Sequence, residues 1–488
     1  MTQPASYHLT KIVATLGPAS DSKEMIGQLV DAGADLFRLN FSHGTHERHE
    51  MVLRLIRKVE EEKDRPIGVI ADLQGPKLRV GALPEGGVPL VPGEEFILRL
   101  GDDPDEEGDE HGCCLPHPEI FKVAEEGTEL LLDDGRLALR ITSKGAETMT
   151  TEVVTGGLLK PRKGLNYPAR YVPVSALTPK DREDLEFALE REVDWVALSF
   201  VQQAADIEEA KKLVAGRASL IAKIEKPQAV ENFDSIVAAT DAVMVARGDL
   251  GVEIAPERVP ALQKQMINKC RAAGRPVIVA TQMLESMTEA SRPTRAETTD
   301  VATALYDGTD AVMLSAESAS GKYPREAVEF MRRILISTEA DPEYRRSLER
   351  ARLDLDDSAP VAIVAAACRV AEVLKASAIV SFSKTGKTTL RASQQRPVCP
   401  LLGLSPLQRT ARMATLCWGV RNIQAPDLSS DDDDMVARAS EAALKSGFAA
   451  PGDTLAITAG VPFGVPGRTN LLRLAVVGEK EPEPGQVK

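Results

Sequence analysis

Charged side chains follow directly on apolar runs at several places in this 488-residue sequence. Lys223 and Glu225 are two residues apart in "SLIAKIE", a spacing that puts both on one face of a strand. Asp249 lies just beyond the next apolar run, "AVMVA". Two carboxylates from neighbouring strands suit a hard divalent cation that keeps water or substrate oxygens as its other ligands. A lysine beside them suits charge stabilisation on a transferring phosphoryl group.

Other polar residues stand at equivalent places, where further apolar runs end. They are Arg38, Asn40, Ser42, His43, Asp72, Thr281, Ser315 and Glu317. A capping or surface role explains each one taken alone. Such a role does not explain why these residues gather at the same end of successive runs. Buried charges are costly without partners, so their gathering needs another reason. Gly248, at the entry to a predicted helix, lets backbone N–H groups approach an anion closely. These residue types together indicate chemistry on a phosphorylated carboxylate.

Short apolar, β-branched runs alternate with segments of helical spacing, the pattern of a parallel sheet covered by helices. The runs span residues 11–16, 36–40, 66–73, 195–200, 219–225, 242–246, 276–281 and 311–315. Eight such runs predict a closed (β/α)8 TIM barrel. Barrel enzymes carry their chemistry beyond the carboxyl ends of the strands, which is where these polar residues fall.

A long segment rich in Gly, Pro, Asp and Glu separates the third run from the fourth and holds strand-like pieces such as "EFILRL" and "RLALRI". We expect an inserted all-β domain at residues 75–169, beginning where Gly75 and Pro76 break the chain. The catalytic barrel would then comprise residues 1–74 and 170–348. Residues 349–488, which include the linker-like "ARLDLDDSAP", are predicted to form a C-terminal α/β domain with strands "AIVSFS", "CPLLGLS" and "TLAITAG".

The overall charge and composition exclude several classes of protein. The net charge of −14 argues against nucleic acid or an anionic membrane as the main partner. Arg369, Glu372 and Lys375 interrupt the most apolar long segment, so it is not a membrane span. We expect no secretory signal at the N-terminus and, with six cysteines in so long a chain, no disulfide framework. These features predict a cytoplasmic protein.

Several strings resemble one family, the pyruvate kinases. In chain order they are "KIVATLGPAS", "FRLNFSHGTH", "IAKIEKPQAV", "VMVARGDLGVE", "VIVATQMLESM", "RPTRAETTDVATALYDGTDAVMLSAESASGKYP" and "GVPGRTN". The resemblance covers nearly the whole chain. It implies transfer of the phosphoryl group of phosphoenolpyruvate to ADP, giving pyruvate and ATP in glycolysis, by a homotetramer.

The resemblance also implies roles for individual residues. Glu225 and Asp249 would bind Mg²⁺ or Mn²⁺. Arg38 would hold the phosphoryl group of the substrate, and Lys223 would stabilise charge on that group and on the developing enolate. The substrate carboxylate would be seated by the backbone of Gly248 and Asp249 and by the Thr281 hydroxyl.

The nucleotide and the proton donor are assigned in the same way. Asn40, His43 and Arg79 would contact the nucleotide together with Lys163, which lies at the far edge of the inserted domain. A water near Thr281 and Ser315 would protonate the enolate carbon. The resemblance implies that the inserted domain is a β-barrel lid, whose closure would exclude water from the phosphoryl group. It also implies that the C-terminal α/β domain is regulatory.

Lys77 marks a departure from the family. Many members read D-T-K-G-P-E where this sequence reads D-L-Q-G-P-K. In the family a monovalent cation, usually K⁺, sits among residues that match Asn40, Ser42, Asp72 and the backbone of Leu73. We hypothesise that Lys77 supplies this positive charge, so that K⁺ is not required. The alternative is a solvated lysine beside an intact K⁺ site.

The segment "SFSKTGKTTL" is similar to a P-loop, but Ser381 stands where that motif needs its first glycine, so a P-loop ATPase is excluded. In the family the corresponding loop binds a phosphorylated allosteric effector. The candidate residues are Ser383, Lys384, Thr385, Gly386, Lys387 and Thr388. The alternative is a structural start of a helix.

Two other functions compete with a kinase. A metal-dependent lyase or aldolase could use Glu225 and Asp249 to stabilise pyruvate enolate, but it needs no nucleotide, so Arg79 and Lys163 count against it. A catalytically silent binding protein would have lost site residues, whereas every expected position is occupied. ADP-dependent pyruvate formation distinguishes the three.

Overall fold

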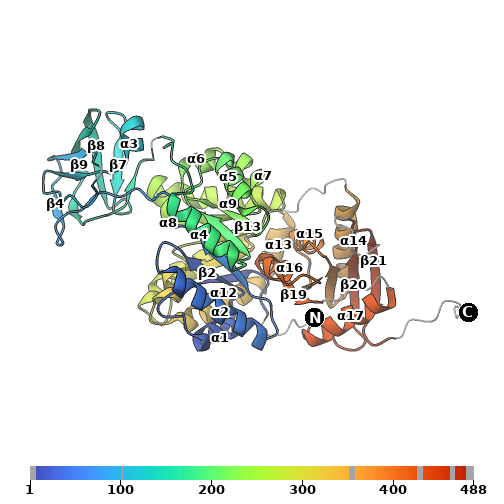
Figure 1. The fold of residues 1–488 in the computed structure, drawn as a ribbon. Helices are drawn as coiled ribbons and strands as arrows, with labels where there is room; N and C mark the ends of the chain where they lie inside the picture. Colours follow the sequence, from blue (N-terminus) through green and yellow to red (C-terminus); the bar gives the residue numbers. More distant parts are fainter. Residues whose placement is uncertain are drawn as a thin grey trace, which may run out of the picture.

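The computed structural model describes residues 7–101, 103–168, 170–350, 358–425, 432–461 and 468–479. Its centre is a closed barrel of eight strands in which every neighbouring pair is parallel (Figure 1). Around the barrel the strands are β1 (Lys11–Leu16), β16 (Ala311–Leu314), β15 (Val277–Ala280), β14 (Ala242–Ala246), β13 (Ser219–Ile224), β12 (Trp195–Leu198), β3 (Gly68–Asp72) and β2 (Leu36–Asn40). The predicted barrel is confirmed, and each predicted run contains one strand.

Both faces of these strands are buried, which is why they read as nearly continuous apolar runs. Val13, Ile70, Ile221 and Met244 belong to an inner cluster, whereas alternate residues pack against the surrounding helices. Those helices are α1 (Lys23–Ala32), α2 (His46–Glu62), α4 (Pro179–Glu190), α5 (Ala204–Val214), α6 (Pro227–Glu231), α7 (Phe233–Ala239), α8 (Arg247–Glu253), α9 (Val259–Ala272), α10 (Arg295–Tyr306), α11 (Ala316–Ala319), α12 (Pro324–Glu339) and α13 (Pro342–Arg350).

The chain leaves the barrel after β3 through a fixed turn. Gly75 has φ +70°, and a Cβ there would lie 2.9 Å from side-chain atoms of Ser199 and Phe200. Its N–H donates to Asp181 Oδ1 at 3.0 Å. Asp181 also accepts from the backbone N–H of Thr178 in the capping box that begins α4. Only glycine fits this turn, which carries the chain outward to the inserted region.

The inserted region, predicted as a β-barrel lid, is a separate all-β unit at one end of the molecule (Figure 1). It holds a curled six-stranded sheet in the order β11-β7-β8-β9-β5-β6 and a two-stranded sheet of β10 and β4. Its elements are β4 (Val88–Leu90), β5 (Glu95–Arg99), β6 (Gly112–Cys114), α3 (Pro118–Val123), β7 (Glu129–Leu132), β8 (Leu137–Lys144), β9 (Thr148–Thr155), β10 (Gly157–Leu159) and β11 (Leu165–Asn166). Phe96, Leu130 and Leu139 lie in its own core.

The C-terminal region is a five-stranded α/β unit at the opposite end (Figure 1). Its sheet runs β19-β18-β17-β20-β21, with β21 antiparallel to β20. The elements are α14 (Ala359–Leu374), β17 (Ala378–Phe382), α15 (Lys387–Gln394), β18 (Leu401–Ser405), α16 (Gln408–Met413), β19 (Val420–Gln424), α17 (Asp432–Lys445), β20 (Thr454–Ala459) and β21 (Leu471–Val476). The predicted strands correspond to β17, β18 and β20. Most of the predicted linker, at 351–357, and residues 464–467 of "GVPGRTN" lie outside the described residues.

The C-terminal unit closes the amino-terminal end of the barrel. Leu416, fully buried, joins the inner cluster of the barrel. Arg412 lies 2.5 Å from Glu60, and Arg396 lies 2.8 Å from Asp310, so arginines of one unit neutralise buried carboxylates of the other. Within the described residues, no helix is both long and apolar enough to cross a membrane.

Candidate functional site

One buried lysine lies among oxygen atoms at the carboxyl ends of β3, β12 and β13. Lys223 Nζ lies 3.0 Å from Glu225 Oε1 and 3.1 Å from Asp72 Oδ1. It also donates to Ser199 Oγ at 2.6 Å. Burial opposes the positive charge, but the two carboxylates outweigh it and raise the pKa of Lys223. This lysine therefore carries its charge inside the barrel mouth.

Asp72 joins this lysine to Arg38. Its second oxygen, Oδ2, accepts from Arg38 Nε at 2.6 Å, and the arginine also donates to Thr15 Oγ1 at 3.2 Å. Burial alone would raise the pKa of Asp72, but the charges of Arg38 and Lys223 outweigh it and lower that pKa. Asp72 thus holds two cations side by side. We call Arg38, Asp72, Lys223, Glu225 and Asp249 the rim site.

Glu225 and Asp249 form the carboxylate pair that the sequence predicted. Burial and the nearby charge of Asp249 raise the pKa of Glu225, while Lys223 lowers it. Glu225 Oε2 accepts only from the backbone N–H of Phe200, at 2.8 Å. Two neighbouring carboxylates of like charge are stabilised by a bound cation, so these side chains fit a divalent metal.

In the part of the chain that the structure describes, Glu225 and Asp249 would be the side-chain ligands of such a metal. Among the residues that the structure describes, no group of three or more His, Cys, Asp or Glu side chains could hold an ion. The other ligands would therefore be oxygens of substrate and water, as expected for Mg²⁺.

A strained loop lies beside the pair. The Gly248 N–H at the start of α8 donates to Thr281 Oγ1 at 2.7 Å, and Thr281 has φ +66°. A β-branched residue rarely adopts this conformation, and such strain persists where its surroundings enforce it. Arg247 holds this backbone in place, because it donates to the Thr281 carbonyl at 2.8 Å and pairs with Asp300 at 2.6 Å.

Ser315 and Glu317 lie beyond β16. The Ser315 hydroxyl is buried and has no hydrogen-bond partner among the described residues. Glu317 accepts from the backbone N–H of Ser315 at 2.7 Å and of Leu284 at 3.1 Å. Burial raises the pKa of Glu317. The orphaned hydroxyl is suited to a substrate or water, whereas Glu317 fixes the backbone.

The four predicted nucleotide residues fall into two groups. Asn40 and His43 line a cavity of about 300 Å³ beyond β1 and β2. Arg79 and Lys163 lie on paired segments of the inserted region, where Lys163 binds Asp133 at 2.6 Å. The two lid residues do not line the cavity, so the structure does not bring all four together.

The predicted K⁺ ligands are already engaged in the structure. Asp72 binds two cations, the Leu73 carbonyl accepts from Ser199 Oγ at 2.7 Å, and Asn40 Oδ1 accepts from the Ser42 N–H at 3.2 Å. Lys77 does not reach Asp72. It extends along Gly164 of the inserted region and lines a narrow gap that Asp249 also borders.

The predicted effector loop connects β17 to α15. Gly386 has φ +77° and precedes the helix, and the Ser383 hydroxyl accepts from the Thr388 N–H at 3.4 Å. The Thr388 hydroxyl also meets that of Thr469 at 2.7 Å. The loop therefore presents hydroxyl groups at a helix N-terminus, which suits an anion.

Sequence reasoning missed Ser199, Phe200 and Thr15, which support the rim site. Ser199 and Phe200 end the apolar run "WVALSF", so the strand-end argument used elsewhere could have found Ser199. Phe200 acts through its backbone N–H, which leaves no signal in residue types.

Comparison with known proteins gives a consistent result. The family model "Pyruvate kinase, barrel domain" matches residues 7–328, and "Pyruvate kinase, alpha/beta domain" matches residues 361–475. A pyruvate kinase of Agrobacterium vitis is 49% identical over 96% of each chain, and one of Methylorubrum extorquens is 47% identical over 97% of this chain and 98% of its own. The crystal structure of a pyruvate kinase from Cryptosporidium parvum matches with a TM-score of 0.91 at 32% identity, over 97% of each chain. The chain belongs to the pyruvate kinase family, whose members transfer the phosphoryl group of phosphoenolpyruvate to ADP and depend on a divalent metal.

Proposed function

We propose that the rim site carries out this transfer with Lys223 and Arg38 as its cationic groups. The observation that supports this most strongly is the placement of both on Asp72, with Lys223 also 3.0 Å from Glu225. Arg38 binds the phosphoryl group of phosphoenolpyruvate. Lys223 stabilises the negative charge that develops when the bond from phosphorus to the enol oxygen breaks and a β-phosphate oxygen of ADP forms the new bond.

Glu225 and Asp249 hold the divalent metal, Mg²⁺ or Mn²⁺. Bound there, the metal supplies charge neutralisation for the phosphoryl group and the enolate. The loop around Gly248 and Asp249, with the Thr281 hydroxyl, seats the substrate carboxylate. Its strained backbone is held by Arg247, so the donors are preorganised before substrate arrives.

The enolate must gain a proton at carbon to become pyruvate. Thr281 and the buried, unpartnered hydroxyl of Ser315 position the water that delivers it. Neither hydroxyl needs to ionise, because each only orients that water.

The nucleotide lies between the barrel and the inserted region. Asn40 and His43 contact it from the barrel, and Arg79 and Lys163 contact it when the inserted region closes. In this proposal, residues 1–74 and 170–348 form the catalytic barrel, residues 75–169 the lid, and residues 349–488 the regulatory domain.

Added K⁺ is not required, on this proposal. Asp72 already has two cationic partners, and Lys77 brings a further positive charge to the gap between lid and barrel. Activity measured with tetramethylammonium in place of K⁺ should stay within about twofold. Lys77→Glu should create dependence on K⁺, whereas Lys122→Glu, elsewhere in the lid, should not. Strong activation of the unmodified enzyme by K⁺ would show that Lys77 is a solvated residue beside a working K⁺ site.

Regulation, assembly and location follow the family. The loop at 383–388 binds a phosphorylated effector, the enzyme is a homotetramer, and the glycolytic reaction places it in the cytoplasm. Neither a nucleic acid nor a membrane is a partner.

A coupled assay for pyruvate tests the central proposal. Pyruvate should form from phosphoenolpyruvate only when ADP and Mg²⁺ or Mn²⁺ are both present, and Glu225→Gln should raise the metal concentration needed for half-maximal rate. Pyruvate formation without ADP would instead favour the lyase or aldolase.

A further inference from the structure

Glu253 is a buried carboxylate to which the proposed mechanism gives no role. It is the last residue of α8, the helix whose first turn carries Asp249. Its side chain is fully buried, and its Oε1 accepts from two donors, Asn166 Nδ2 at 2.6 Å and Lys226 Nζ. Asn166 belongs to the inserted region and Lys226 to the barrel. We call Asn166, Lys226 and Glu253 the Glu253 bridge.

The position of Glu253 does not favour a negative charge. The carboxylate stands at the C-terminal end of a helix, where the helix dipole is negative. Its Oε2 is buried and has no hydrogen-bond partner among the described residues. A carboxylate that served stability alone would have both oxygens satisfied or would be replaced by an apolar side chain. The bridge to the inserted region therefore needs a reason beyond the stability of α8.

Lys226 connects Glu253 to the metal carboxylate Glu225. It follows Glu225 directly in the chain, and its Nζ lies 5.6 Å from the centre of the Phe200 ring. The backbone N–H of Phe200 donates to Glu225 Oε2 at 2.8 Å, and Phe200 is held at φ +56°. Such a conformation persists only where the surroundings enforce it. A displacement of Lys226 would therefore change the support of Glu225.

Asn166 connects Glu253 to the core of the inserted region. It belongs to β11, where it lies opposite Leu131 of β7. The neighbouring residue, Leu165, is buried in that core, and its N–H donates to the Leu78 carbonyl at 2.9 Å. Because β11 is fixed in this way, a movement of the inserted region as a unit carries Asn166 with it.

We propose that Glu253 is a positioning residue that couples the position of the inserted region to metal binding by Glu225 and Asp249. Through Oε1 it joins Asn166 to the segment of Glu225, and its own helix carries Asp249. A movement that withdraws Asn166 leaves Oε1 with Lys226 alone and frees both segments to shift. This inference rests on the metal site proposed above.

Binding of Mn²⁺ to the full chain, measured from the electron paramagnetic resonance signal of unbound Mn²⁺, tests the coupling without any turnover. Asn166→Ala and Glu253→Gln break the bridge at its two sides. Asn268→Ala on α9 and Glu257→Gln are the matched controls, because both residues are exposed. Glu225→Gln is the reference variant for the metal site itself. Thermal melting of each variant verifies the fold.

We expect Asn166→Ala to weaken Mn²⁺ binding by at least about fivefold, although Asn166 touches neither metal carboxylate. Glu253→Gln should weaken it at least as much, and the double variant should be no weaker than Glu253→Gln alone. Coupling is reciprocal, so Mn²⁺ should also slow hydrogen–deuterium exchange in the peptide that contains β11. That protection should be absent in Glu253→Gln and present in Glu257→Gln.

The inference is overturned if Asn166→Ala and Glu253→Gln both bind Mn²⁺ within about twofold of the unmodified chain, whatever their melting temperatures. It is equally overturned if the two effects add in the double variant, because the residues would then act independently. Loss of Mn²⁺ binding in Glu225→Gln alone would leave the proposed metal site intact and remove only the coupling. Unchanged binding in Glu225→Gln would overturn the metal site and the coupling together.

Discussion

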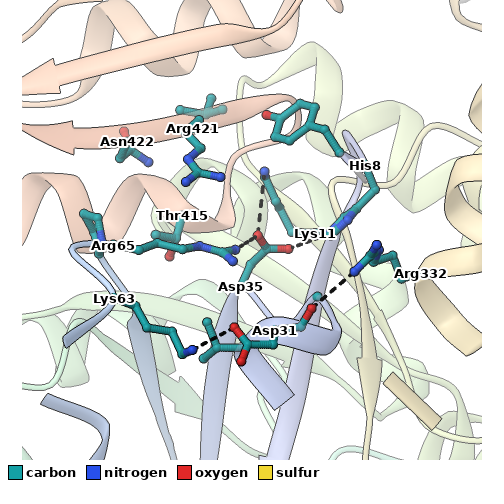
Figure 2. Close-up of a pocket in the computed structure, with 15 residues that line it drawn as sticks. His8, Lys11, Asp31, Asp35, Lys63, Arg65, Arg332, Thr415, Arg421 and Asn422 are labelled. Carbon is teal, nitrogen blue, oxygen red and sulfur yellow. Dashed lines mark hydrogen bonds and ion pairs between the residues drawn. The ribbon is translucent and has the colours of Figure 1, made fainter. Parts of the chain in front are cut away.

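The two ends of the barrel carry buried charge in opposite proportions. At the carboxyl end, the rim site places Asp72, Glu225 and Asp249 around Lys223 and Arg38. At the amino end, one carboxylate, Asp35, pairs with His8, Lys11 and Arg65 (Figure 2). Strand β2 connects the two, since it begins just after Asp35 and carries Arg38 at its middle.

The pKa values of Glu225 and Asp35 therefore shift in opposite directions. Burial raises the pKa of Glu225, and Asp249 adds to the rise. Burial acts in the same direction on Asp35, but Lys11 and His8 outweigh it and lower that pKa. Carboxylates outnumber cations at the carboxyl end, whereas cations surround the carboxylate of Asp35 at the amino end. Burial alone therefore does not indicate what a charged cluster binds. The ratio of positive to negative side chains does.

Removal of the single central carboxylate should have the largest effect. Asp35→Ala would remove the carboxylate that pairs with buried Lys11 and half-buried Arg65, which costs about 3–5 kcal/mol of unfolding free energy. Urea unfolding of the full chain measures the loss. Asp31→Ala, whose side chain is 68% exposed, should cost under about 1 kcal/mol. Equal losses in the two variants would mean that the amino-end cluster is not a buried electrostatic centre.

Lowering the pH should reduce the contribution of Asp35 to the free energy of unfolding. The lowered pKa of Asp35 means that its contribution to stability is complete above the pKa of an unfolded aspartate, about 3.9, and is lost as the pH falls toward the lower folded value. The stability gap between the unmodified chain and Asp35→Asn should therefore be constant from pH 7 to about pH 5 and shrink below about pH 4. A gap that narrows already between pH 7 and 6 would contradict this assignment.

At the other end, Lys223→Met should reduce kcat by about 10²- to 10³-fold, because a preorganised cation is lost where charge develops. The measurement is ADP-dependent pyruvate formation at saturating substrate. Lys212→Met, on an exposed position of α5, is the matched control and should keep full activity. A kcat within threefold of the unmodified enzyme would remove Lys223 from the chemistry.

Ser199→Ala should give the smallest change. Ser199 touches Lys223 at 2.6 Å and the Leu73 carbonyl at 2.7 Å, so it positions the lysine and does not itself touch substrate. Loss of one hydrogen bond to a charged group predicts a fall in kcat of about tenfold with little change in KM. Ser199→Thr, which retains the hydroxyl, should recover part of the rate. A change in KM alone would indicate a binding role instead.

Much of the barrel could be predicted, because its strands are buried on both faces and therefore appear in the sequence as apolar runs. The runs at 11–16, 36–40 and 242–246 match the observed strands residue for residue. The strand-end argument also gathered Lys223, Glu225 and Asp72, since parallel strands bring their carboxyl ends to one rim.

Two kinds of feature escaped prediction. Strands β19 and β21 lie at the edges of the C-terminal sheet, where half-exposed residues such as Arg421 and Arg473 break the apolar signal. The cavity of about 560 Å³ between the barrel and β19 joins residues hundreds of positions apart, such as Arg65 and Arg421, and its two walls come from separate units. Nothing in the spacing of either segment indicates that the other will face it.

The seam between the barrel and the C-terminal unit has an evolutionary consequence. A Cβ at Gly68, the first residue of β3, would lie 2.5 Å from Thr415 Oγ1 and 2.9 Å from the Arg412 carbonyl. Leu416 meanwhile belongs to the same inner cluster as the barrel strands. A barrel separated from the C-terminal unit would expose an apolar hole to water. It would also deprive Glu60 of Arg412 and Asp310 of Arg396. The barrel is therefore not an independent folding module. Gene fusions that move it to another protein should give a folded barrel only when the C-terminal unit is moved with it.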